Sequence, residues 1–311
     1  MAALLNIYKD NPPELLGNLD ATQVSIEFNS IEELATTGES KEKKKPLTRT
    51  GTNRLGVSIK QFTLVSASGH ISLTLLLSEP TLGEDDFVHF PVPGLSLSIG
   101  DPSFTTEVCF CKTRTGTRSF FEYLFTTVVI NFVSRVRELA PSSSREKPYF
   151  LIIDGEAIQS EVLQRQTVLD FFVSNNIQIG KGPASTSGAC GNPLDMGNFF
   201  KSQKTLAGSS ADILDQFPAL QERILDCIKT HSTSGKLSTM GSERKSKATE
   251  AIIRTIKSCD DLHNIPSIVR RGFNLLGVYP HDPLTTLNCC ANIIPEEEQK
   301  LILAAIPNYL Y

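Results

Sequence analysis

The sequence predicts an α/β fold: a mixed sheet flanked by helices, followed by a helical C-terminal region. The segments 58–65 and 71–77 alternate apolar and polar residues around the short turn 66–70, a pattern typical of an antiparallel hairpin. Farther along, the apolar strand 149–153, a helical pattern and a short strand at 175–179 predict a parallel βαβ unit. Because one unit is antiparallel and the other parallel, the predicted sheet is mixed.

Composition limits the classes of function. The 311 residues with 40% hydrophobic content suffice for one large or two smaller domains. A net charge of -4 gives no global support for nucleic-acid binding, so any such surface must be local. Seven cysteines in no secretory pattern, and an N-terminal apolar stretch too short for a signal peptide, favour a reduced intracellular compartment. No apolar run reaches the roughly 18 residues of a membrane span, so we expect no membrane partner.

The first half of the chain predicts strands joined by polar loops. Residues 23–28 alternate as a half-buried strand does, with Asp20 at its front. The polar stretch 36–53 contains three consecutive lysines and predicts an exposed, mobile, basic loop. The stretch 78–116 is rich in Pro, Gly and acidic residues, and only short strands or loops are predicted there.

Helical patterns dominate the second half. Apolar residues recur at helical spacing over 118–139, which predicts an amphipathic helix, and a second helix is expected at 161–173. Residues 180–192 are rich in Gly, Ser and Ala, as flexible loops beside a site often are. We therefore expect a catalytic domain over 1–210 and a helical extension over 211–311. The predicted helices beyond residue 200 span 213–228, 245–257 and 265–276.

Two acidic residues stand out. Asp154 ends the buried strand 149–153, and Asp195 stands at a predicted helix start. Carboxylates delivered from different elements to the carboxyl edge of a sheet suit hard divalent cations, which points to phosphodiester chemistry. Each motif has a simpler alternative, because Asp-Gly is common in turns and Asp195 would serve equally as a helix N-cap.

Three motifs carry a resemblance to a known family: Asn18-Leu-Asp20-Ala-Thr-Gln23, Phe150-Leu-Ile-Ile-Asp154-Gly155 and Pro193-Leu-Asp195-Met-Gly-Asn-Phe-Phe-Lys201. In their order and context the chain resembles the catalytic domain of a pogo- or mariner-like transposase of the DDE endonuclease superfamily. The resemblance implies an RNase H-like fold with a mixed five-stranded sheet. It also implies two-metal DNA cleavage and strand transfer, with Asp20, Asp154 and Asp195 as catalytic residues and ligands of two Mg²⁺ or Mn²⁺ ions.

The same resemblance implies a DNA partner and a nuclear location, and it allows a homo-oligomer. No nucleotide cofactor is expected, because the chain has neither a Walker loop nor a Rossmann fingerprint. Lysines close to the motifs are candidate ligands of the DNA backbone, although the lysine run would equally suit a solvated loop or an import signal. These lysines are Lys43, Lys44, Lys45, Lys181, Lys201 and Lys204.

Departures from the family pattern keep alternatives open. Glu156 stands where relatives commonly carry His, and the chain before Asp20 is too short for helix-turn-helix modules, as in a fragment or a stripped-down derivative. The alternative is a domesticated, catalytically inactive domain that binds DNA or protein, and a third option is an RNase H-like nuclease acting on RNA. Cys109 and Cys111 match no common zinc-finger spacing and are expected to be buried thiols.

Overall fold

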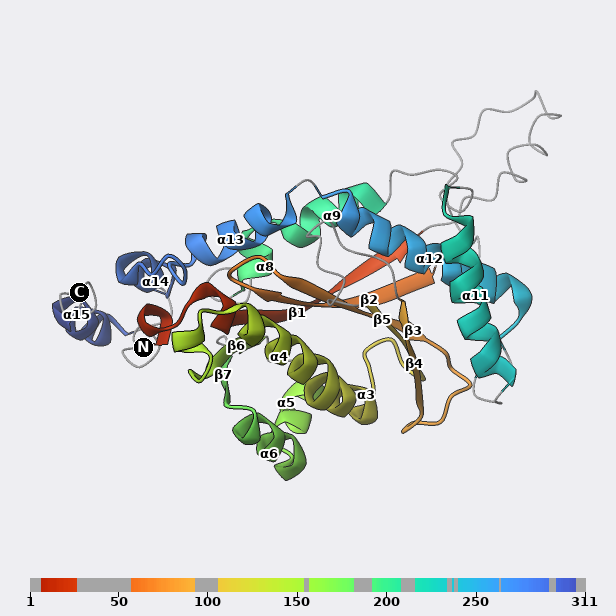
Figure 1. The fold of residues 1–311 in the computed structure, drawn as a ribbon, viewed down its shortest axis with the longest axis horizontal. Coiled ribbons are helices and arrows are strands. Elements are labelled where there is room, and N and C mark those ends of the chain that lie inside the picture. Colours follow the sequence, from red (N-terminus) through yellow and green to blue (C-terminus); the bar gives the residue numbers. More distant parts are fainter. Residues whose placement is uncertain are drawn as a thin grey trace, which may run out of the picture.

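A single mixed sheet lies between two layers of helices in the computed structural model (Figure 1). This confirms the predicted α/β class. No helix in the described part of the chain is both long and apolar enough to span a bilayer. The structure describes residues 7–26, 57–92, 106–153, 157–181, 192–207, 216–233, 237, 240–262, 264–290 and 295–305.

Within the described residues, the sheet has seven strands in the order β4-β5-β3-β2-β1-β6-β7. Antiparallel pairs join β1 to β2, β2 to β3 and β4 to β5, whereas β1–β6, β6–β7 and β3–β5 are parallel. Both the predicted hairpin, β2–β3, and the predicted βαβ unit, β6 to β7, are therefore present. The strands are β1 (Leu16–Ile26), β2 (Val57–Ser66), β3 (Ile71–Ser78), β4 (Phe87–Val92), β5 (Thr106–Cys111), β6 (Tyr149–Ile153) and β7 (Ile177–Lys181).

The seven strands in the described part of the chain are two more than the five expected. The additional strands, β4 and β5, come from the segment 78–116, where only short strands or loops were predicted. In β5 nearly every residue is buried, so the polar–apolar alternation that identifies a strand is absent. In β4 the alternation is present but includes Pro91, which cannot donate to a ladder and is tolerated because β4 ends the described sheet.

The strand that carries Asp20 begins earlier than predicted. It starts at Leu16 rather than at Gln23, because both faces of its first half are buried and the sequence does not alternate there. Asp20 therefore lies within β1, not at its front. Along β1, Leu16 and Val24 contribute to one hydrophobic core and Leu19 to the other, which fixes the face on which each side chain lies.

Helices cover the two faces of the sheet in separate groups, visible on opposite sides of the strands in Figure 1. The α12 face packs against α8, α9, α11, α12 and α13, and the α4 face packs against α3, η3, α4, α5 and α6. The helices are η1 (Pro13–Leu15), α3 (Arg118–Tyr123), η3 (Leu124–Val129), α4 (Ile130–Leu139), η4 (Ser142–Ser144), α5 (Ala157–Leu163), α6 (Gln166–Ser174), α8 (Pro193–Met196), α9 (Phe199–Ala207), α11 (Pro218–Thr233), α12 (Ser242–Asp260), α13 (Ile265–Leu275), α14 (Pro283–Cys290) and α15 (Glu296–Ala305).

Most predicted helices are present with altered ends. The helix predicted at 118–139 is continuous, and its central segment η3 is a π-helix. The helix predicted at 161–173 is two helices, α5 and α6, because Arg165 adopts an extended conformation between them. The domain boundary expected near residue 210 lies outside the described residues. Phe199 and Ile252, on either side of it, belong to the same hydrophobic core.

Candidate functional site

Three parallel strands reach the same level of the sheet beside Asp20. Leu19 in β1 pairs with Ile153 at the end of β6, and Ile153 pairs with Lys181 at the end of β7. Asp154 is the next residue after Ile153 and lies outside the described residues, as does Glu156. The last residue of β6 therefore lies opposite Leu19, the residue before Asp20 in β1.

Asp20 is a buried carboxylic acid on the α12 face. Only 7% of it is exposed, and the alternation along β1 puts it on the same face as Asn18. Its neighbour across the ladder is Thr63 of β2, which is fully buried. Its Oδ1 accepts a hydrogen bond of 2.7 Å from the backbone N–H of Ala21. A carboxylate held this far from solvent requires polar or cationic neighbours, which suits a ligand position.

Asp195 lies in the first turn of the short helix α8, where its side chain is exposed. The N-cap of this helix is Asn192, whose side chain accepts a hydrogen bond of 3.1 Å from the N–H of Leu194. The alternative that Asp195 is the N-cap is therefore wrong. The negative charge of Asp195 is favourable in the first turn of the helix.

Asn18 joins the elements that carry the three acids. Its side chain is buried, with 1% of the residue exposed. Its Nδ2 donates to the carbonyl of Ile152 in β6 at 3.1 Å, and its Oδ1 accepts from the N–H of Leu194 in α8 at 3.4 Å. One amide on β1 therefore contacts the strand that precedes Asp154 and the turn that carries Asp195. No pattern in the sequence marks Asn18 as part of a site, although its two-residue spacing from Asp20 puts both side chains on one face.

Helix α13 holds α8 against the sheet. A Cβ atom on Gly272 would lie 1.9 Å from the carbonyl oxygen of Pro193, so only glycine allows the two backbones this close approach. On the same helix, Arg270 donates from Nε and Nη2 to the carbonyl of Ser68 in the β2–β3 turn, at 3.0 and 2.7 Å. The turn with Asp195 is thus fixed by a helix that is itself tied to the sheet.

A buried amide pair fixes α9 over the same face. Gln203 of α9 and Gln61 of β2 are both fully buried and donate to each other at 2.6 and 3.0 Å. Gln61 also donates to the hydroxyl of Thr63 at 2.8 Å. Because Thr63 is the ladder partner of Asp20, this network connects α9 to the neighbourhood of the acid.

The candidate DNA-binding lysines are only partly described. Lys201 and Lys204 are exposed on α9, on the side of the helix away from buried Gln203. Lys181 is the last residue of β7 and pairs with Ile153, but the structure does not describe its side chain. The run Lys43, Lys44 and Lys45 also lies outside the described residues. Two of the six lysines are thus placed on a helix that covers the face of Asp20.

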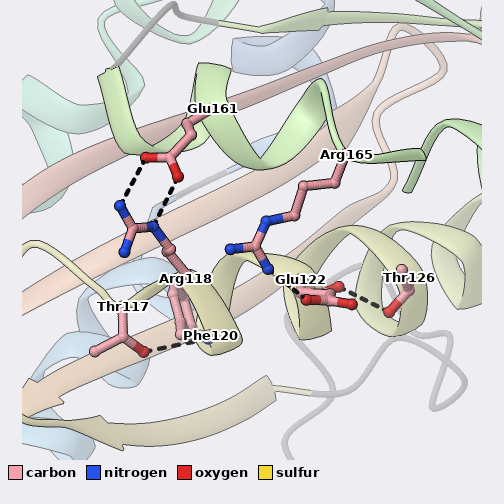
Figure 2. Close-up of polar contacts among 7 residues, drawn as sticks. All are labelled: Thr117, Arg118, Phe120, Glu122, Thr126, Glu161 and Arg165. Carbon is pink, nitrogen blue, oxygen red and sulfur yellow. Dashed lines mark hydrogen bonds and ion pairs between the residues drawn. The ribbon is translucent and has the colours of Figure 1, made fainter. Parts of the chain in front are cut away.

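Ion pairs anchor the helix that follows the Asp154 segment. In Figure 2, Arg118 of α3 donates from Nε and Nη2 to Glu161 of α5, at 2.7 and 3.3 Å. Arg165 donates to Glu122 at 3.0 Å. The hydrogen bond from Arg118 lowers the pKa of Glu161 below its ordinary value of 4.5. These solvent-exposed ion pairs connect α3 with α5 and with Arg165, which follows α5.

The cysteines in the sheet are buried thiols, as expected. Burial raises the pKa of the Cys111 thiol to about 11 and raises that of Cys109 well above its ordinary value. Both are therefore protonated at neutral pH and are poor metal ligands. Within the described ranges, no three His, Cys, Asp or Glu side chains are grouped to hold a metal ion.

The donor chemistry of Asp20 and Asp195 fits the metal that the resemblance implies. Both supply carboxylate oxygens, the ligands that Mg²⁺ and Mn²⁺ prefer. The elements that carry them meet at Asn18, close to the end of β6. No protein-family model matches this chain, and no curated protein or solved structure matches it either.

Proposed function

We propose that this chain is a transposase-derived DDE endonuclease domain that cleaves and transfers DNA strands with two Mg²⁺ or Mn²⁺ ions. The observation that carries the proposal is the junction at Asn18. There a single amide links the strand of Asp20, the strand that ends one residue before Asp154, and the helix turn of Asp195. This junction supports a shared site, because it joins β1, β6 and α8 on the α12 face.

The strand order supports an RNase H-like fold for this domain. Five contiguous strands, β3-β2-β1-β6-β7, would form the five-stranded sheet of that fold, with β4 and β5 added outside β3. In this assignment the first acid lies on the first strand, the second follows the fourth strand, and the third lies on a later helix. That is the arrangement the family resemblance implies for Asp20, Asp154 and Asp195.

The roles of the residues follow from their positions. The three carboxylates would hold the metals, and Asn18 would keep their elements in register. When bound, the two ions would activate a water or 3′-hydroxyl and stabilise the leaving oxygen. Lys201 and Lys204, exposed on α9, would contact backbone phosphates of the DNA.

A plasmid-nicking assay in Mg²⁺ or Mn²⁺ tests this function. We expect Asp20→Asn, Asp154→Ala and Asp195→Asn each to lower the cleavage rate about 100-fold or more, because each removes a metal ligand. The matched control is Asp170→Asn, and this variant should cut at the wild-type rate. Asp170 is an exposed acid on α6 that accepts a hydrogen bond from Gln166. Equal cleavage by Asp154→Ala and the wild type would refute the proposal.

The second candidate is a catalytically inactive derivative that binds DNA or protein, favoured by Glu156 beside the second acid. It predicts wild-type protein that binds a DNA duplex in a fluorescence-anisotropy titration yet cuts nothing in either metal. Offering RNA, RNA–DNA hybrid and DNA in the same assay separates the third candidate, a nuclease acting on RNA.

A further inference from the structure

A cavity of about 590 Å³ lies on the α12 face, away from the acids. It is bounded by the start of β2, the end of β3, the loop after β5 and the first turns of α12. Ser58 lines it, five residues before Thr63 on β2, so it lies roughly 17 Å along the strand from the level of Asp20. Its volume is within the range of small-molecule sites.

The floor of the cavity is apolar. Side chains from three strands, from α12 and from the residue before its N-cap supply it, and four of the five are buried. An apolar surface of this kind favours a ligand with an aliphatic or aromatic body, because binding removes that body from water. The apolar lining residues are Val57, Leu77, Phe110, Met240 and Ala248.

The rim is cationic, and two of its cations are held in place. Arg244 donates a hydrogen bond to the carbonyl of Ser78 at 2.8 Å. It also forms an ion pair at 3.4 Å with Glu79, whose side chain is only 1% exposed. Lys247 pairs with Glu243 at 2.6 Å. Each of these cations is therefore largely balanced by a nearby carboxylate.

Arg114 supplies the unbalanced charge. It is exposed at the cavity, and among the residues that the structure describes it has no hydrogen-bond or ion-pair partner. Helix α12 begins at the same rim with Gly241 as N-cap, which offers no side-chain acceptor to the first N–H groups. A guanidinium and a helix start together favour an anion with several acceptor oxygens.

We propose that this cavity binds a small organic phosphate, with the apolar body on the floor and the phosphate at Arg114 and Arg244. The proposed binding does not depend on DNA cleavage, because the acids are not among the residues that line the cavity. The probe is 1-naphthyl phosphate, whose fluorescence can be followed directly in a chain without tryptophan. Comparison probes are 1-naphthol, which lacks the phosphate, and inorganic phosphate, which lacks the body.

We expect saturable binding of 1-naphthyl phosphate, with affinity for 1-naphthol and for inorganic phosphate each lower by about tenfold or more. Arg114→Ala should weaken binding of 1-naphthyl phosphate by about tenfold, since it removes a charge-assisted hydrogen bond. The matched control is Lys112→Ala, which should leave the affinity unchanged. Lys112 is a nearby, partly exposed cation that forms an ion pair with Glu84. Asp20→Asn should also leave it unchanged.

Thermal unfolding followed by circular dichroism shows whether the variants are folded. Arg114→Ala should have the same melting temperature as the wild type. The proposal is overturned if 1-naphthyl phosphate does not saturate the protein at millimolar concentration. It is equally overturned if 1-naphthol binds as tightly as the phosphate, or if folded Arg114→Ala binds as tightly as the wild type.

Discussion

The two faces of the sheet are built from different chemistry. The α4 face is an aromatic core, in which Phe121 lies 5.6 Å from Phe62 and 6.4 Å from Phe125 between ring centroids. The α12 face is also apolar for much of its area, but it contains buried polar side chains with specific partners, among them Asn18 and Gln203.

This difference indicates that one face contributes mainly to stability and the other to the geometry of the site. Aromatic packing is favourable over a range of geometries, whereas a buried amide without its partner costs free energy. Buried amides therefore restrict the positions of the strands and helices that they join. The α4 face would stabilise the fold, and the α12 face would set the relative positions of Asp20 and Asp195.

The largest expected effect is on the α4 face. Phe121→Ala removes a fully buried ring and should lower the free energy of unfolding by about 3–5 kcal/mol in urea denaturation. The control is Phe171→Ala on α6, where the ring is already half exposed and the change should be small. At a temperature where Phe121→Ala remains folded, it should cleave DNA at the wild-type rate. Slow cleavage by the folded variant would contradict the separation of roles.

Asn18→Ala should act on both stability and cleavage. Losing the amide leaves the contacts to Ile152 and Leu194 unmade and should cost about 1–3 kcal/mol of unfolding free energy. Cleavage by the folded variant should fall, since α8 loses its hydrogen bond to β1. Thr22→Val, a same-face substitution four residues along β1, serves as the control and should leave cleavage unaffected. If both variants cleave at the same rate, Asn18 has no positioning role.

The amide pair of α9 allows a double-mutant cycle. Gln203→Leu alone leaves Gln61 without its partner and should cost about 1–3 kcal/mol in urea denaturation. Combining it with Gln61→Leu should cost less than the sum of the two single changes, because neither buried amide remains unsatisfied. Additive costs in the double variant would show that the pair is not coupled.

The smallest expected effect is that of Arg118→Ala. Its partner Glu161 is exposed, and solvent screens such pairs, so the melting temperature should change less than in Phe121→Ala, Asn18→Ala or Gln203→Leu. Because the pKa of Glu161 is lowered, any stabilisation is present above the ordinary value of 4.5 and disappears as the pH falls through the lowered pKa. A melting-temperature difference that grows on acidification would contradict this assignment.

Regular patterns in the sequence predicted much of the fold. The hairpin β2–β3 follows from two strand patterns around a short turn, the helix over 118–139 from helical spacing, and β6 from its continuous apolar run. The starts of β1 and β5 could not be predicted in this way, because residues buried on both faces do not alternate. The break at Arg165 depends on tertiary contacts, such as its ion pair with Glu122, which local propensity does not contain.

The site was predictable only in part. The acids could be proposed from their motifs, but the register that sets Leu19 opposite Ile153 comes from strand pairing between distant segments. The role of Asn18 depends on a helix 176 residues away along the chain, so local sequence alone does not reveal it. The sequence predicted a helix start at Asp195, whereas α8 begins at Pro193 with Asn192 as its N-cap.

The proposed function requires Asp20, Asp154 and Asp195 to hold metal ions together, and metal-directed cleavage of the protein tests this requirement. Fe²⁺ bound in place of Mg²⁺ generates oxidants that cut the backbone next to the metal when ascorbate and peroxide are added. We predict cuts close to Asp20, Asp154 and Asp195, mapped by mass spectrometry, and their joint loss in Asp20→Asn. Cuts at only one of the three segments, or cuts unchanged in Asp20→Asn, would contradict a shared site.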